Sequence, residues 1–214
     1  MDRTVNVAFV VETFFLMLIG IGPKIALLPF LDTTAGLDPE TTRRVSRKMI
    51  TTAGTVAFLL LALGELLTRL LHFDPGSLSV AGGIVLLIIA ISMVLGTSTN
   101  ELGSRSTATD DPMALAVYPL AIPYLLNPVG IVALVTQSAE SAALGTFAVV
   151  VILVAGVLVL DLATFGLASR FSQHLNENRL LVAEKVFGFL LAALAVQLIL
   201  DGLSSTGVIH LTGH

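Results

Sequence analysis

Long apolar segments alternate with short polar ones along almost the whole chain. A helix needs about 20 mostly apolar residues to cross the hydrocarbon core of a bilayer. Six segments meet that requirement, at approximately 5–31, 46–71, 79–97, 113–137, 142–169 and 181–203. The connections between them are short, as in a helix bundle. The pattern therefore predicts an all-α polytopic membrane protein with six transmembrane helices.

Glycine and proline interrupt the first and the fourth of these spans. The first contains Gly22-Pro23, and the fourth contains Asn127-Pro128-Val129-Gly130, with Pro123 one turn earlier. Proline removes a backbone donor and clashes with the carbonyl one turn back, so each helix should kink or unwind there. Freed backbone groups are tolerated in a membrane only where protein buries them or where they line a cavity. Paired broken spans in the two halves of a membrane protein point to a transporter's binding site.

A weak internal repeat relates the two halves of the chain. A shift of 105 positions places Pro23 on Pro128 and Gly83 on Gly188. Each half holds three spans, an odd number, so the halves should cross the membrane in opposite directions. We therefore expect two inverted-topology three-helix repeats, with helices one and four broken. The expected units are the first repeat at 1–100, a hydrophilic linker at 101–112, and the second repeat with a short tail at 113–214.

Composition strengthens the membrane assignment. The 214 residues are 55% hydrophobic and only 12% charged, whereas soluble domains carry roughly 25% charged residues. There is no cysteine, which excludes disulfides and cysteine metal sites. The four histidines fall in predicted connections or the tail, without metal-ligand spacing. We expect no metal and no resident cofactor, a lipid bilayer as the surroundings, and no nucleic-acid partner because the basic residues are few and scattered.

Lysine and arginine concentrate in the connections after spans one, three and five, which predicts that these connections are cytoplasmic. Both termini are then extracytoplasmic in a multi-pass protein of the plasma or inner membrane. The residues on the cytoplasmic side are Arg43, Arg44, Arg47, Lys48, Arg105, Arg170 and Arg179, with Lys185 just inside span six. The opposite side has only Arg3 and Arg69.

Four motifs, taken together in this order, resemble the MarC family of membrane proteins. They are 23–31 (Pro-Lys-Ile-Ala-Leu-Leu-Pro-Phe-Leu), 80–83 (Val-Ala-Gly-Gly), 118–123 (Tyr-Pro-Leu-Ala-Ile-Pro) and the segment 188–202. The resemblance implies six spans and membership of a group of small neutral amino acid transporters, distantly related to the lysine-exporter superfamily. The family usually has Asn-Pro or Asp-Pro in span one and Gly-Pro-Gly in span four. Here the amide stands in span four, as Asn127-Pro128, and span one has Gly22-Pro23.

Asn127 is the first candidate for contact with a substrate. Its amide offers donors and an acceptor at about mid-membrane depth, which suits the amine and carboxylate of a small zwitterion. A second interpretation is that Asn127 caps the half-helix that starts at Pro128, and both can hold together. The other candidates for the substrate site complete the two breaks: Gly22, Pro23, Pro123, Pro128 and Gly130. For Gly22 and Pro23 the alternative is close helix packing through small residues.

Three charged residues within the spans are candidates for ion coupling or for a buried charge pair. Lys24 and Asp161 lie at similar depth in the cytoplasmic half, so they could pair, although Lys24 could instead extend its side chain to the interface. An ionisable residue at mid-bilayer costs at least ~2.5–3.5 kcal/mol and marks a functional site. Asp161 could bind a coupling proton or Na⁺, and Glu12 lies toward the outer side.

Three polar positions in the spans have structural interpretations. Glu65 should form an ion pair with Arg69 one turn later. Ser92 and Gln197 should hydrogen bond between helices rather than contact a ligand.

These features favour a secondary transporter of small solutes that works by alternating access around the paired breaks. The resemblance implies glycine- or alanine-type substrates. No Walker-type Gly-Lys-Ser/Thr occurs in the sequence, so we expect energy from an ion gradient or a separate partner. The alternatives are an efflux protein or channel for another metabolite or drug and, less favoured, an intramembrane enzyme. We assign no catalytic residue, because no nucleophile and base converge in the spans. Whether copies of the chain associate stays open.

Overall fold

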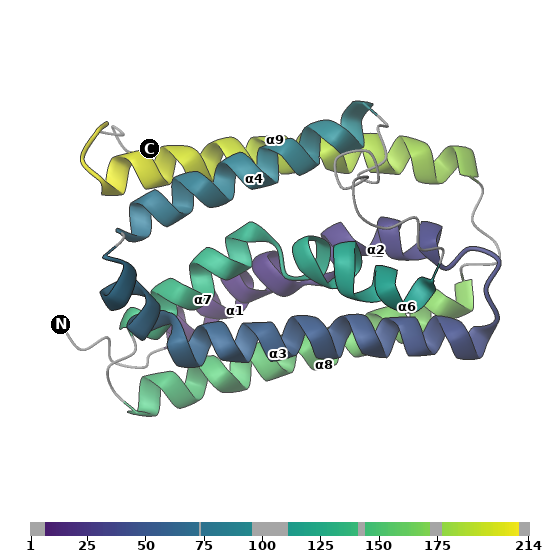
Figure 1. The fold of residues 1–214 in the computed structure, drawn as a ribbon, viewed down its shortest axis with the longest axis horizontal. Coiled ribbons are helices and arrows are strands. Elements are labelled where there is room, and N and C mark those ends of the chain that lie inside the picture. The colour runs from purple at the N-terminus through teal and green to yellow at the C-terminus, as the bar shows by residue number, and fades with distance from the viewer. Residues whose placement is uncertain (1–6, 73, 96–110, 141–143, 172–176, 210–214) are drawn as a thin grey trace.

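The computed structural model describes residues 7–72, 74–95, 111–140, 144–171 and 177–209, and every regular element within them is helical. Figure 1 shows these helices running roughly along one common direction. Their bounds are α1 (Val7–Ile21), α2 (Pro23–Thr33), α3 (Pro39–Leu71), α4 (Pro75–Leu95), α6 (Pro112–Leu115), the wide helical segment η1 (Ala116–Leu125), α7 (Pro128–Glu140), α8 (Leu144–Phe171) and α9 (Glu177–Ser205). The expected all-α polytopic architecture is confirmed. Most of the expected linker at 101–112 lies outside the described residues.

Five helical segments in the described part of the chain are long and apolar enough to cross a membrane, the first being Val7–Thr33 with its break. The count becomes six when Pro112–Leu125 and Pro128–Ala139, bent by 68° at the second break, are taken as one span. Each expected span therefore has a helix at its place in the chain.

The helix of the second span begins before the apolar segment because a local cap extends it. The Asp38 carboxylate accepts hydrogen bonds from the backbone N–H groups of Glu40 and Thr41, at 2.9 and 3.0 Å. Pro39 occupies the first helical position, where its missing N–H costs nothing. Hydrogen bonding with Thr41 also lowers the pKa of Asp38, which lies outside the membrane span. The helix thus begins at Pro39, seven residues before the apolar segment.

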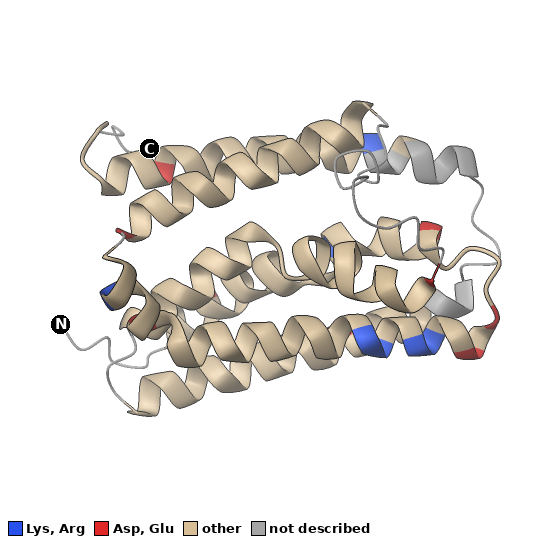
Figure 2. Cartoon of the chain, in the orientation of Figure 1, with Lys and Arg blue, Asp and Glu red and all other residues tan. Residues whose placement is uncertain are grey.

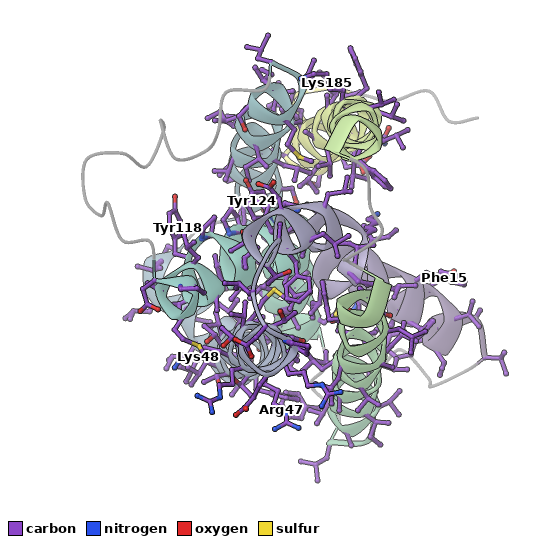
Figure 3. All side chains as sticks on the ribbon, turned by 90° about the vertical axis from the view of Figure 1, so that its right-hand side faces the viewer. Phe15, Arg47, Lys48, Tyr118, Tyr124 and Lys185 are labelled. Carbon is purple, nitrogen blue, oxygen red and sulfur yellow. The ribbon has the colours of Figure 1, made fainter. Side chains whose placement is uncertain are left out.

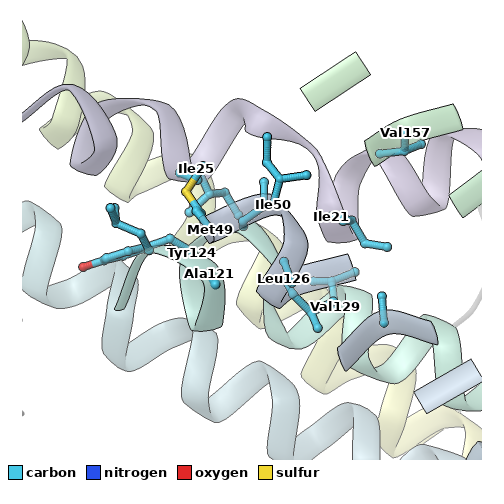
Figure 4. Packing of buried hydrophobic residues seen from close by; sticks show 14 of the residues in the cluster. Ile21, Ile25, Met49, Ile50, Ala121, Tyr124, Leu126, Val129 and Val157 are labelled. Atoms are coloured by element: carbon cyan, nitrogen blue, oxygen red, sulfur yellow. The ribbon is translucent and has the colours of Figure 1, made fainter. Parts of the chain in front are cut away.

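The helices form layers that place the two breaks in the middle of the bundle. In Figure 1, α4 and α9 lie together along one side and α3 and α8 along the other. Between these pairs lie α1, α2, α6, η1 and α7. Figure 4 shows apolar side chains from both breaks meeting residues of α3 and α8, with Ile21 and Ile25 beside the first break and Leu126 and Val129 beside the second. The breaks therefore sit inside the buried core.

The α4–α9 contact is close because glycines face carbonyl groups across it. A Cβ added at Gly83 would lie 2.8 Å from the carbonyl oxygen of Ala195, and one added at Gly188 would lie 3.1 Å from that of Ala90. The shift of 105 positions relates Gly83 to Gly188 and also relates Ala90 to Ala195. Exchanging the halves of the chain therefore exchanges these two contacts. A two-fold axis between inverted repeats would produce this reciprocity, which supports the inverted repeat as a prediction.

The outer surface is suited to a bilayer. Large apolar side chains such as Ile152 and Leu190 are more than half exposed, and Figure 3 shows Phe15 directed away from the neighbouring helices. Figure 2 shows that the charged residues gather mostly at the two ends of the bundle, leaving an apolar band between them. The four basic residues of α3 that predict the cytoplasmic side, from Arg43 to Lys48, lie at one of these ends.

The expected orientation can be tested with single cysteines, since the chain has none of its own. Ala35 lies exposed between α2 and α3, and Ser77 lies exposed near the start of α4. In spheroplasts we expect a membrane-impermeant maleimide to label Ser77→Cys directly and Ala35→Cys only after permeabilisation. Labelling in the reverse order would place the arginine-rich end of α3 outside the cell.

Candidate functional site

The breaks of the first and fourth spans are joined by direct hydrogen bonds through Asn127. Its backbone N–H donates to the carbonyl oxygen of Gly20 at 3.0 Å. Its side-chain Nδ2 donates to the carbonyl oxygen of Ile19 at 2.7 Å. In a continuous helix the Ile19 carbonyl would accept from the N–H four residues later, but that residue is Pro23, which has none. Asn127 therefore supplies the donor that Pro23 removes.

The first break is short and local. Gly22 is extended (φ −71°, ψ 164°) and precedes Pro23, the first residue of α2. No side chain caps the N-terminus of α2, and Lys24 is exposed on its first turn. The helix then continues through Pro29 as far as Thr33. The interruption expected across the Gly- and Pro-rich segment is therefore confined to Gly22-Pro23.

The second break is longer because three prolines contribute to it. Tyr118 (φ −139°, ψ 125°) and Ile122 (φ −135°, ψ 124°) leave the helical region, as expected for residues that precede proline. The peptide bonds after both are cis. Pro123 is half-buried in η1, and Leu126 is extended before α7 starts at Pro128.

Asn127 caps α7 as well as bonding to α1. Its Oδ1 accepts from the backbone N–H of Gly130 at 3.1 Å, and Pro128 takes the first helical position. The residue has no exposed surface. The capping interpretation is thus confirmed, and both polar atoms of the carboxamide have protein partners. Contact of Asn127 with a substrate stays a prediction.

Two glycines allow the breaks to approach each other at backbone distance. A Cβ added at Gly20 would lie 2.7 Å from the backbone nitrogen of Gly130, and one added at Gly130 would lie 2.7 Å from the carbonyl carbon of Gly20. Either distance is too short for a real side chain. Gly82 of α4 also packs near this junction, because its added Cβ would lie 3.5 Å from Cβ of Pro128.

The sequence pattern predicts the two interruptions but not their contact. A signal was nevertheless present, since Ile19 lies four residues before Pro23 and must find another donor if it is buried.

Asp161 is buried within α8 without a hydrogen-bond partner. The residue has no exposed surface, and neither carboxylate oxygen has a partner. Lys24, in contrast, is exposed on α2, and the Lys24–Asp161 ion pair that their depths allow does not form. Glu12 is exposed on α1 and does not meet Asp161 either.

The remaining polar candidates bond within their own helices. Glu65 and Arg69 form the expected exposed ion pair, at 2.5 Å. The prediction of bonds between helices was wrong for Ser92, whose Oγ donates to the Ile89 carbonyl at 2.7 Å, and for Gln197, whose Nε2 donates to Asp201 at 2.8 Å. Among the described residues no group of three or more His, Cys, Asp or Glu could hold a metal ion. His174, His210 and His214 lie outside that part of the chain.

Replacing Asn127 by alanine should destabilise the protein. The substitution leaves the Ile19 carbonyl and the Gly130 N–H buried without their partner, at about 1–3 kcal/mol for each such group. We expect the thermal midpoint in detergent to fall by about 2–4 °C per kcal/mol for a chain of this size. Gln197→Ala removes an exposed amide and is the matched control, expected to stay near the native midpoint. Equal midpoints for the two variants would contradict the bridging role of Asn127.

The glycine contact gives an independent test. Gly20→Ala places a methyl group against the backbone of Gly130 and should cost about 1–3 kcal/mol through overpacking. Gly156 lies on α8 with nothing within 4 Å of an added Cβ, so Gly156→Ala should be neutral or stabilising by up to about 1 kcal/mol. Thermal unfolding of both variants in the same detergent measures the difference. A neutral Gly20→Ala would show that the breaks do not pack at backbone distance.

Comparisons with known proteins agree with this architecture. Residues 7–206 match the family described as MarC family integral membrane protein. The chain is 26% identical over 200 residues to UPF0056 membrane protein YvbG of Bacillus subtilis, covering 92% of this chain and 94% of that one. It is 26% identical over 196 residues to UPF0056 inner membrane protein YhgN of Escherichia coli K12, covering 91% and 95%.

A third relative, a UPF0056 membrane protein of Archaeoglobus fulgidus, is 25% identical over 205 residues, covering 95% of this chain and 96% of that one. No solved structure matches the chain. Because the family match runs from the first described helix to the last, the protein belongs to the MarC family of integral membrane proteins.

Proposed function

We propose that the protein is a secondary transporter of small neutral amino acids that alternates access around the two joined breaks. The observation that carries this proposal is the hydrogen-bonded contact between Asn127 of span four and the carbonyls of Ile19 and Gly20 in span one. Interrupted helices that meet in the core of a membrane bundle are typical of transporter binding sites. The glycine- or alanine-type substrate rests on the family resemblance.

The packing of the halves supports an alternating mechanism. Helix α3 of the first half packs on η1 and α7 of the second half, and α8 of the second half packs on α1 and α2 of the first half. These two sets of contacts exchange when the halves are exchanged, as do the glycine contacts between α4 and α9. Inverted repeats allow one packing of the two halves to open toward one side of the membrane. The packing with the roles of the halves exchanged opens toward the other side.

The first break offers the better contact for a substrate carboxylate. Asn127 caps the N-terminus of α7 at the N–H of Gly130, whereas the first turn of α2 has no side-chain cap and carries the exposed Lys24. Helix N-termini attract carboxylates, and a nearby ammonium group adds to that attraction. In this proposal Gly22 and Pro23 bound the carboxylate site, while Pro123, Pro128 and Gly130 form the facing side around Asn127.

Uptake of radiolabelled glycine and alanine into proteoliposomes tests the function. We expect saturable uptake above empty liposomes, competed by unlabelled small neutral amino acids and not by lysine or glutamate. No transport above empty liposomes, in either direction and under imposed proton or sodium gradients, would sink the amino acid assignment if the protein is folded. The same vesicles loaded with other metabolites then test the alternative of an efflux protein.

Lys24→Gln tests the site without disturbing the core, because Lys24 is exposed. Loss of a charge-assisted hydrogen bond of about 1.5 kcal/mol should raise the KM for glycine roughly tenfold. Lys48→Gln removes an exposed lysine from the charged end of α3 and is the control, expected to keep the native KM. An unchanged KM in Lys24→Gln, with active native protein, would move the carboxylate site away from α2.

A further inference from the structure

We propose that Asp161 is a proton-binding site that opens when α2 swings away from α8, and that it couples a proton gradient to transport. This coupling role rests on the proposed transport function. The binding of a proton by Asp161 does not, and it is tested separately below.

Asp161 belongs to the most deeply buried stripe of α8. Val150, Val154, Val157, Asp161 and Phe165 follow one another at helical spacing, and none of them has exposed surface. The stripe faces the interior of the bundle, as Figure 4 shows for Val157. A carboxyl group therefore occupies a position where its neighbours along the helix are apolar.

Two helices close over this part of α8. One turn after Asp161, the ring of Phe165 packs edge-to-face against Phe30 of α2, with centroids 5.0 Å apart. Three residues before Asp161, Leu158 meets α3, since a Cβ added at Gly54 would lie 3.0 Å from its Cδ1. Contacts on both sides of Asp161 thus hold α2 and α3 against the segment that contains it.

The described structure offers no compensation for a negative charge at Asp161. Neither oxygen has a hydrogen-bond partner, and buried charges in proteins are otherwise paired. The charged residues on the neighbouring helices are exposed: Glu12 on α1, Lys24 and Asp32 on α2, and Glu40, Arg43, Arg44, Arg47, Lys48, Glu65 and Arg69 on α3. On α7 and α8 the other charged residues are Glu140 and Arg170, near the helix ends, whose side chains lie outside the described residues.

A proton fits this site better than a metal cation does. A hard cation takes several oxygen ligands, whereas in the described part of the chain no group of three or more His, Cys, Asp or Glu surrounds Asp161. A proton needs a single oxygen and leaves the group neutral, which removes the need for a partner. The step is the reversible binding of one proton to the Asp161 carboxylate, with no other bond formed or broken.

The location of Asp161 links proton binding to the first break. Phe30 lies on α2, the half-helix that starts directly after the Gly22-Pro23 break, and its partner Phe165 lies on α8. A swing of α2 about that break would separate the two rings and admit water to Asp161. The ionised form is stable only when solvated, so release of the proton favours the open arrangement and binding favours the closed one.

Infrared spectroscopy of the reconstituted protein tests the proton site directly. At neutral pH we expect the native protein to show the carbonyl stretch of a protonated carboxyl group. The spectrum of Asp161→Asn should lack this band. Asp201→Asn removes an exposed carboxylate from α9 and is the matched control, expected to keep the band. A native protein without the band, or Asp161→Asn with it, would overturn the proposal.

Transport assays test the coupling. An outward-directed or inward-directed proton gradient should drive glycine accumulation in native protein and in Asp201→Asn. In Asp161→Asn we expect the ratio of gradient-driven accumulation to glycine exchange to fall at least tenfold. An unchanged ratio, or accumulation driven by sodium and not by protons, would overturn the coupling role. If the native protein moves no amino acid at all, the transport proposal fails, and the infrared result still decides whether Asp161 binds a proton.

Discussion

A backbone carbonyl inside a membrane must find a donor, and the junction of the two breaks follows from that requirement. Pro23 cannot serve the carbonyl of Ile19, so a donor from elsewhere in the chain must come close to it. Asn127 does so with its side chain at 2.7 Å and with its backbone N–H toward Gly20 at 3.0 Å. The absence of side chains at Gly20 and Gly130 is what makes such an approach sterically feasible. The missing N–H of Pro23 therefore explains why an amide stands at Asn127 and why the two contacting residues are glycines.

This junction also ties the layers of the bundle together. On one side, α7 packs on α4 where Gly82 lies against Pro128, and α4 packs on α9 through the reciprocal contacts of Gly83 and Gly188. The reciprocity of these contacts includes larger side chains. Gly83 also contacts Ile199, and Gly188 also contacts Val94. Val94 and Ile199 are themselves related by the shift of 105 positions. On the other side, α2 reaches α8 through Phe30 and Phe165. A change at the breaks can thus reach both outer pairs of helices.

The features that the sequence predicts correctly are local ones. The ion pair of Glu65 with Arg69 depends on two residues one turn apart, and the helix at each expected span depends on a continuous apolar segment of the chain. Counting residues along a span gives depth in the membrane, but it does not give the direction in which a side chain points. Lys24 and Asp161 have similar depths, yet Ala26, which is buried, follows Lys24 by two residues and so lies about 200° around the helix. The two residues do not pair because their side chains point in different directions, and that direction is set by the tertiary packing.

The exchanged position of the amide has a structural consequence for the family pattern. An asparagine before the proline caps the half-helix that follows it, so its location decides which of the two half-helices has a satisfied first turn. In this chain α7 is capped by Asn127, and α2 begins at Gly22 with no side-chain cap. An Asn-Pro in span one would cap α2 instead and leave α7 open. The predicted inverted repeat makes the two breaks equivalent, so the amide can bridge them from either side. In the proposed transporter, the side it takes determines which first turn, here that of α2 beside Lys24, remains free for the substrate carboxylate.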